Sequence, residues 1–269
     1  MLPLLSACFE TIEMDFPAHQ PRPVINALFT PDSVWQVDVT TSKSLNYEDA
    51  YDTIPNATIE IFEGDIRVDS LIYLGGTTYR SSQDRKPREG EEYTLRFSAP
   101  GYPDCYATDR VPVLPEMEFI SLDTVAANPM FYLYGEKVVV TVLIKDRPEP
   151  NFYYTNVFDF SRGSIGFQNS YHNPPISAIE FGYRKVFSDQ VFNGKNHRLI
   201  FDYENFNDGE TFIDIGIVSG SYFRYAKDYE EHLYDQLEML ATPSDVYSNV
   251  EGGFGIFAAY YSLTFRVRE

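Results

Sequence analysis

Cysteine chemistry near the N-terminus is the strongest chemical signal in this sequence. Leu5, Ser6 and Ala7 precede Cys8. An apolar residue and two small residues before a cysteine form the pattern at which bacterial lipoprotein precursors are cut, and the new N-terminal cysteine is then acylated. We therefore predict lipidation at Cys8. Several acyl chains on one cysteine make a stable membrane anchor, because each buried methylene contributes about 0.8 kcal/mol.

The residues around Cys8 decide between an anchor and a buried strand. A complete export signal has a basic start and an apolar run of about 7 to 15 residues. Only residues 1–5 supply such a run here, so we expect the sequence to begin inside that signal. Leu4, Leu5 and Cys8 could instead start a strand, since free cysteine is often buried. Residues 9–23 are acidic and dotted with proline, which favours a solvated tether.

The second cysteine is Cys105. If Cys8 is acylated, Cys105 has no partner. A disulfide between Cys8 and Cys105 is the alternative in an oxidising compartment.

Other catalytic or metal-binding patterns are weak. The four histidines are scattered, and Glu231-His232 lacks the second histidine of a zinc-protease helix; they are His19, His172, His197 and His232. Glu204 to Glu210 carries calcium-like oxygen ligands but places Phe206 at a ligand position, so a solvated turn is favoured. No nucleophile elbow is present. We predict neither a metal site nor a cofactor.

Carboxylates and aromatic residues are abundant without forming a recognisable site. Among 40 Asp and Glu residues some pair must lie close together, and a glycosidase needs such a pair, but spacing does not select one. The aromatic residues include 21 Tyr and 21 Phe. Exposed rings could stack on sugars, whereas core packing is their usual role in sheets. The candidates for an exposed platform are Tyr153, Tyr154, Tyr171, Tyr260 and Tyr261.

The net charge of −19 argues against nucleic acid as a partner, because phosphates would be repelled. No apolar run approaches the 18 or so residues of a spanning helix, so we expect membrane association through the lipid at Cys8.

Alternating apolar and polar residues indicate a mainly β fold. Short strands are predicted near 35–39, 57–61, 71–74, 93–97 and 105–107. They predict an N-terminal β-sandwich, immunoglobulin-like or transthyretin-like, over residues 23–114 after a signal remnant and tether at 1–22. Pro112 and Pro115 mark the boundary to a second antiparallel β domain, 115–269, in which residues 137–144 form a central strand.

One amphipathic helix is expected within the second domain, near residues 222–240. Apolar residues recur there at steps of three and four, Ser221 can cap the start and Pro243 bars continuation. Such a stripe usually covers an open sheet face. After it, Gly252, Gly253 and Gly255 let the backbone turn tightly or pass close to another element before a final strand.

Several of these segments together resemble a known family. They are Asn56 to Ile59, residues 91–112, Asn151 to Tyr154, Phe187 to Asp189, Phe192 to Gly194, Tyr222 to Tyr225 and Pro243 to Phe257. The chain resembles the Bacteroidetes outer-membrane lipoproteins grouped as domain of unknown function 4249, most specifically in the last segment. The resemblance implies an outward-facing lipoprotein, often encoded beside a TonB-dependent transporter, and implies no activity.

Our first hypothesis is a non-enzymatic surface lipoprotein that assists nutrient capture or import by such a transporter; its small-molecule or glycan ligand is unknown. The second is a surface hydrolase with a carboxylate site, which would show a cleft with two convergent carboxylates, one of raised pKa. The third is a structural or adhesive module, which would show a flat apolar patch.

Overall fold

The computed structural model describes residues 19–44, 51–125, 136–159, 168–172, 178–182, 184–205, 211–237 and 245–268. Over these residues the fold is mainly β with one helix, as predicted. The strands are β1 (Pro23–Phe29), β2 (Gln36–Thr41), β3 (Thr58–Glu63), β4 (Ile66–Gly75), β5 (Thr78–Ser81), β6 (Glu92–Ser98), β7 (Cys105–Arg110), β8 (Glu116–Val125), β9 (Glu136–Lys145), β10 (Phe152–Asp159), β11 (Gln168–His172), β12 (Ile179–Phe181), β13 (Arg184–Ser188), β14 (Asn196–Asn205), β15 (Thr211–Val218) and β16 (Phe254–Arg268), and the helix is α1 (Gly220–Leu237).

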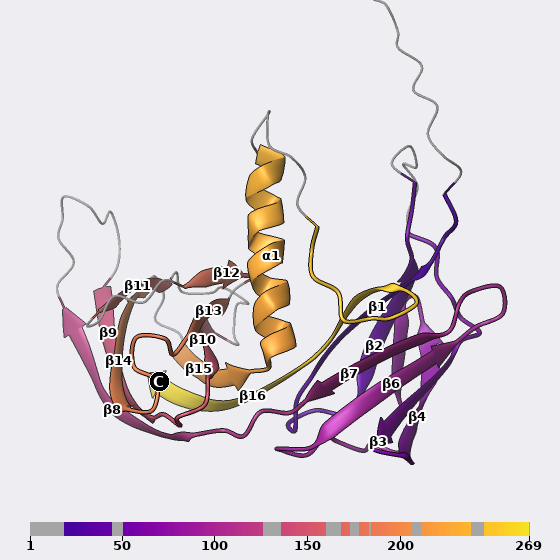
Figure 1. Cartoon of the computed structure of the whole chain (residues 1–269). Coiled ribbons are helices and arrows are strands. Elements are labelled where there is room, and N and C mark those ends of the chain that lie inside the picture. Colours follow the sequence, from indigo (N-terminus) through magenta and orange to yellow (C-terminus); the bar gives the residue numbers. More distant parts are fainter. Residues whose placement is uncertain are drawn as a thin grey trace, which may run out of the picture.

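The strands form two sheets. A 12-stranded sheet has the order β12-β13-β10-β15-β16-β1-β2-β5-β4-β3-β6-β7, and a four-stranded sheet has the order β11-β14-β9-β8. The large sheet is mixed and not purely antiparallel, because β1 and β16 run parallel, with Val24 opposite Phe254. Figure 1 shows the N-terminal strands β1 to β7 on one side of α1 and most of the C-terminal strands on the other.

The N-terminal strands curl round one core, which is the sandwich-like part of the fold. The far edge strand β7 returns to the last strand, since Tyr106 bridges Glu251 just before β16. Alternate residues of β1, β2 and β6 point inward, and β16 adds Phe257, whose ring stacks on Phe29 at 4.4 Å between centroids. Residues 23–114 therefore share a core with the last strand of the chain. The division into two domains at 114/115 stays a prediction.

Glycines allow β16 to approach the N-terminal strands closely. Gly255 has φ of +107°, and a Cβ there would lie 2.0 Å from the carbonyl oxygen of Ile25. A Cβ on Gly252 would lie 2.2 Å from the carbonyl oxygen of Asp104. The predicted close approach of this glycine-rich segment is confirmed, because no side chain fits in either place.

A second core lies between the four-stranded sheet and the C-terminal part of the large sheet. It contains Val140, Leu199, Tyr153 and Ile215 at 0 % exposure. The predicted central strand at 137–144 is confirmed, because β9 lies between β14 and β8. The edge strand β11, residues 168–172, pairs with β14 on the other side of this sheet.

The helix covers the sheet with its first half only. It begins at Gly220, and its cap is Ser219 and not Ser221, because the Tyr222 amide N–H donates to Ser219 Oγ at 3.2 Å. Tyr222 and Ala226 are buried, whereas Leu233 is 43 % exposed. The later turns rise away from the sheets in Figure 1. None of the described helices is long and apolar enough to span a bilayer.

Candidate ligand-binding groove

A groove of about 800 Å³ lies between α1 with β12 and the outer face of β1, β2 and β5. Its volume is in the range of small-molecule sites, about 300 to 1,000 Å³. We call it the groove; its lining residues are Asn26, Ala27, Leu28, Asp32, Ser33, Val34, Gln36, Asp38, Arg80, Lys86, Phe181, Tyr225 and Ile256.

Strand alternation builds the polar wall of the groove. In β1, Ile25 and Ala27 are buried in the N-terminal core, so Asn26 projects from the opposite face of the strand. Sheet register then sets polar residues in rows, since Asn26 pairs with Asp38 and Gln36 pairs with Arg80. Residues directly opposite each other in an antiparallel pair project from the same face. The wall is therefore fixed by the sheet itself.

Aromatic rings form the other wall. Phe181 of β12 lies edge-on to Tyr225 of α1, with ring centroids 5.8 Å apart and planes at 86°. Edge-to-face contacts of this kind are favourable. Burial, with a smaller effect of neighbouring Tyr229, raises the pKa of the Tyr225 phenol, so its hydroxyl stays protonated at neutral pH and can donate a hydrogen bond.

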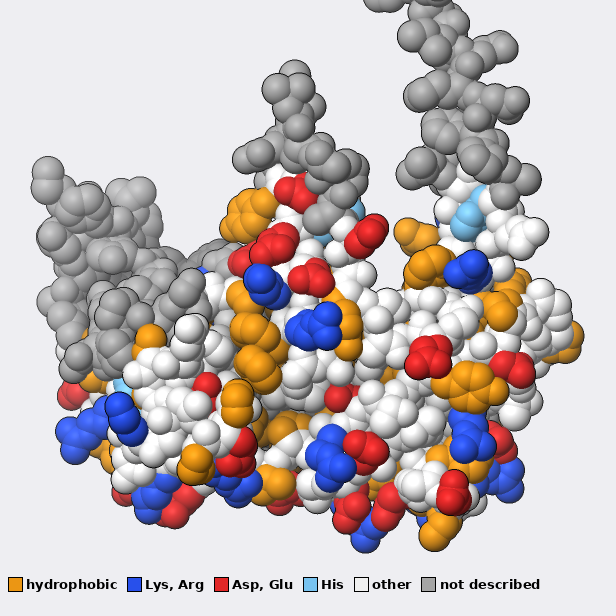
Figure 2. Space-filling view, viewed as in Figure 1, with side chains coloured by type: hydrophobic (Ala, Val, Ile, Leu, Met, Phe, Trp, Pro, Cys, Tyr) orange, Lys and Arg blue, Asp and Glu red, His pale blue; other side chains and the backbone are white. Residues whose placement is uncertain are grey.

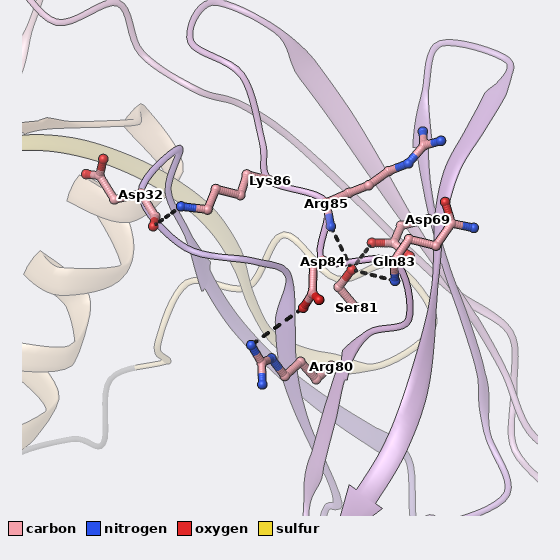
Figure 3. A network of polar contacts seen from close by, with 8 residues as sticks. All are labelled: Asp32, Asp69, Arg80, Ser81, Gln83, Asp84, Arg85 and Lys86. Atoms are coloured by element: carbon pink, nitrogen blue, oxygen red, sulfur yellow. Dashed lines mark hydrogen bonds and ion pairs between the residues drawn. The ribbon is translucent and has the colours of Figure 1, made fainter.

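A hydrogen-bond network holds the segment that follows β5 at the rim. Ser81 is buried and donates to the carboxylate of Asp69, while its hydroxyl oxygen accepts from the amides of Gln83 at 3.3 Å and Arg85 at 3.1 Å. Figure 3 shows this network beside Lys86, whose ammonium donates to the backbone carbonyl of Asp32 at 2.8 Å. The rim is thus joined to the turn after β1.

The charged residues of the groove balance one another. Asp32 and Asp38 carry negative charge, and Arg80 and Lys86 carry positive charge. Asp38 Oδ1 accepts hydrogen bonds from Thr77 at 3.0 Å and Thr78 at 2.7 Å. The groove is therefore near neutral within a protein of net charge −19. Figure 2 shows acidic and basic side chains intermingled on this face of the molecule.

A smaller hollow of about 400 Å³ lies on the other side of the rim segment. Trp35, Tyr93, Arg85 and Arg88 are among the residues that line it. The guanidinium of Arg88 pairs with Glu63 at 2.6 Å, which reduces the positive charge available to a ligand.

Asp109 has a carboxyl group with a strongly raised pKa, and it lies outside the groove, near the start of α1. Burial raises the pKa of Asp109 to about 6, although hydrogen bonds from Ser219, the Ala259 amide and Ser221 oppose the rise. Asp109 on β7 accepts from Ser221 Oγ at 3.2 Å and from the Ala259 amide at 2.8 Å. This carboxylate links β7, β16 and the start of α1, so its role is structural.

A second buried carboxylate, Asp189, follows β13. Burial also raises its pKa. It accepts from the Asn151 amide at 2.7 Å, and it does not line the groove.

The structure describes one of the two cysteines, Cys105. Cys8 lies outside the described residues, so its lipidation stays a prediction. Cys105 is a free thiol at 0 % exposure, and burial raises its pKa to about 11. A thiol with so high a pKa is a poor nucleophile at neutral pH. The alternative, a disulfide with Cys8, is not formed at Cys105, because its thiol is free.

The three histidines whose side chains are described do not converge on a site. His19 is hydrogen-bonded to Ser42, His197 is buried against the ring of Phe192, and burial lowers the His197 pKa. The side chain of His172 lies outside the description, and His232 is on α1. Within the described ranges, no group of three or more His, Cys, Asp or Glu residues could hold a metal ion.

The described members of the candidate aromatic platform pack into cores and do not form an exposed surface. Tyr153 and Tyr154 are fully buried, and Tyr260 and Tyr261 are half-buried and pack against different cores. The side chain of Tyr171 is not described, and the segment from Phe206 to Glu210 lies outside the described residues. Packing, the favoured interpretation, is confirmed for the described four.

Sequence reasoning missed the groove residues. The outward positions Asn26, Gln36 and Asp38 could be read from alternation in the first two strands. Phe181 and Tyr225 could not be assigned to the same site, because they come from distant segments that meet only in the fold.

Comparison with known protein families assigns this chain to a family. The family described as domain of unknown function (DUF4249) matches residues 10–266. This chain belongs to that family. DUF4249 covers all the described strands and α1 except the last two residues of β16, and it brings no assigned activity. No curated protein matches the chain.

Solved structures share only distant likeness with this DUF4249 member. The yeast delta-COP-I mu-homology domain complexed with a Dsl1 WxWxV peptide is 10 % identical with a TM-score of 0.27, covering 92 % of this chain and 96 % of that one. A putative membrane anchored protein from Corynebacterium diphtheriae is 14 % identical with a TM-score of 0.22, covering 92 % of this chain and 59 % of that one. Similarity at this level carries no argument about function.

Proposed function

We propose that this protein is an outer-membrane lipoprotein, anchored at Cys8 and facing the cell exterior, that binds a nutrient without converting it. It assists import of that nutrient by a TonB-dependent transporter. The observation that carries the binding role is the groove of about 800 Å³ with one polar and one aromatic wall. The anchor and the transporter rest on residues 5–8 and on the family resemblance.

Binding fits the groove better than hydrolysis does. A hydrolase needs a carboxylate whose raised pKa keeps it protonated beside a second carboxylate. Among the described residues, the carboxyl groups for which burial raises the pKa are those of Asp109 and Asp189, and both lie outside the groove. Within the groove, one oxygen of Asp38 is already held by two threonine hydroxyls. This arrangement orients a carboxylate for binding and supports the non-enzymatic role.

The proposed role is tested by deleting the gene in the native host. Uptake of one nutrient should fall while its extracellular breakdown is unchanged. Loss of breakdown would instead favour the hydrolase, and unchanged uptake of every nutrient would reject the transport role. Complementation with Gln36→Ala should fail to restore uptake, whereas Gln190→Ala, which changes an exposed glutamine outside the groove, should restore it.

The anchor is tested separately with Cys8→Ala. The protein should leave the membrane fraction, because the acylation site is lost. Continued retention in that fraction would reject acylation at Cys8.

A further inference from the structure

We infer that the ligand of the groove is a neutral, polyhydroxylated molecule, an oligosaccharide of a few rings. The inference rests on the proposed binding role and names its ligand class. It follows from three features that meet in the groove: balanced charge, unengaged amide side chains on one wall, and aromatic rings on the other.

Charge disfavours an anionic ligand. The surrounding protein carries −19, which repels anions over distances of a Debye length. Both cations of the groove already have partners, since Lys86 donates to the Asp32 carbonyl at 2.8 Å and Arg80 lies 3.8 Å from Asp84. The two acids and two bases leave the groove itself near neutral, so an anionic ligand gains nothing there that would offset repulsion by the surrounding protein.

The polar wall offers groups that suit hydroxyls. Among the described residues, no hydrogen bond engages the side-chain amides of Asn26 and Gln36 or the carboxylate of Asp32. An amide side chain both donates and accepts, and so does a hydroxyl. A ligand without hydroxyls would strip water from these groups and leave them unpaired, at a cost in affinity. Several hydroxyls on one ligand would satisfy them together.

The aromatic wall suits the apolar faces of sugar rings. Phe181 and Tyr225 lie nearly perpendicular, so they present both a ring face and a ring edge. Aromatic side chains pack apolar surface on their faces while a phenol supplies a polar end. The Tyr225 hydroxyl has no hydrogen-bond partner in the part of the chain that is described. It adds a donor on this wall.

A peptide is the less suitable neutral ligand. Peptides commonly bind by adding a strand to an open sheet edge. The strands that form the polar wall, β1, β2 and β5, are each paired on both sides. No backbone edge is therefore available on the polar wall, and the edge strand on the aromatic wall, β12, is only three residues long.

The inference is tested by titration calorimetry on the purified full-length protein. The probes are neutral tetrasaccharides of glucose, mannose and xylose, with tetragalacturonate as the anionic comparison and a neutral tetrapeptide as the peptide comparison. We expect at least one neutral tetrasaccharide to bind and the other two classes to bind at least tenfold more weakly. Gln36→Ala and Tyr225→Ala should each weaken binding about tenfold, a loss of about 1.4 kcal/mol.

Matched controls separate local from general effects. Gln190→Ala and Tyr234→Ala remove the same residue types at exposed positions outside the groove and should bind as wild type does. Circular dichroism melts check that each variant is folded. If Tyr225→Ala fails to fold, Gln36→Ala, whose side chain is exposed, carries the test.

Defined outcomes overturn the inference. It falls if none of the three tetrasaccharides binds, if tetragalacturonate or the peptide binds more tightly, or if the groove variants bind unchanged. Failure of the ligand class is distinct from failure of the transport role. If the groove variants abolish uptake but no saccharide binds, the transport role stands and the ligand class is wrong. If a saccharide binds but uptake is unchanged in the deletion strain, the ligand class stands and the transport role is wrong.

Discussion

The carboxylate of Asp109 should make stability depend on pH in an unusual direction. It lies at the junction of β7, β16 and the start of α1, where Ser221 and the Ala259 amide donate to it. Most carboxylates in folded proteins have lowered pKa values and stabilise the fold as pH rises. Asp109 does the opposite, because burial raises its pKa from 3.8 to about 6.

The magnitude follows from linkage. Between pH 3.8 and about 6 the folded state holds more protons at Asp109 than the unfolded state does, so rising pH lowers the free energy of unfolding. A shift of roughly two units corresponds to about 3 kcal/mol. This contribution is complete below pH 3.8 and is lost as the pH rises through 6. Asp109→Asn keeps an oxygen acceptor but cannot ionise, so it should lack this loss.

The assay is urea denaturation of wild type and Asp109→Asn at several pH values from 4 to 8 and constant ionic strength. The free energy of unfolding of the variant, taken relative to that of wild type, should rise by about 3 kcal/mol between pH 4 and pH 7. Comparing the two proteins cancels the titration of the other carboxylates. A difference that stays constant over this range, or one that grows in favour of wild type, would refute the reasoning. Carbon-13 NMR of the Asp109 carboxyl gives its pKa directly.

Three further perturbations follow from the packing. Gly255→Ala should destabilise the fold by more than about 2 kcal/mol in a thermal melt, because the new Cβ would meet the Ile25 carbonyl, whereas Gly76→Ala, also at positive φ but in open space, should cost about 1 kcal/mol. The fragment 23–114 should not fold cooperatively by NMR, because it lacks Val250, Phe257 and Ala259 of its own core; a well-dispersed spectrum would contradict this. Tyr154→Phe should lower the free energy of unfolding by about 1.5 to 3 kcal/mol in urea, since it removes the 2.6 Å hydrogen bond to the Asp214 carboxylate, and an unchanged midpoint would show that this bond contributes nothing.

Local patterns predicted the elements well. The alternation near residues 35–39 and 93–97 corresponds to β2 and β6, and the helical stripe corresponds to α1. Both patterns depend on neighbours in sequence, because the side-chain period of a strand or helix is a local property. The predicted helix cap, Ser221, was wrong by two residues, because the cap is Ser219. Either serine could supply the capping hydroxyl.

Strand pairing was beyond local reasoning. Asn193-Gly194 is a sequence typical of hairpin turns. Gly194 does have φ of +70°, but the turn joins β13 and β14, which belong to different sheets. A turn signal fixes the local backbone conformation. It does not choose the partner of the following strand, because that choice depends on which core buries the strand.

The sequence by itself determined a β-rich chain of the DUF4249 family, its single helix, its close-packed glycines and its candidate acylation site. Only the tertiary structure decided that the last strand pairs with the first and that α1 and β12 lie across from β1, β2 and β5. The physical reason is distance along the chain. Asn26 and Tyr225 share one groove because burial of β16 in both cores brings the two ends of the chain together, and no local pattern records that burial.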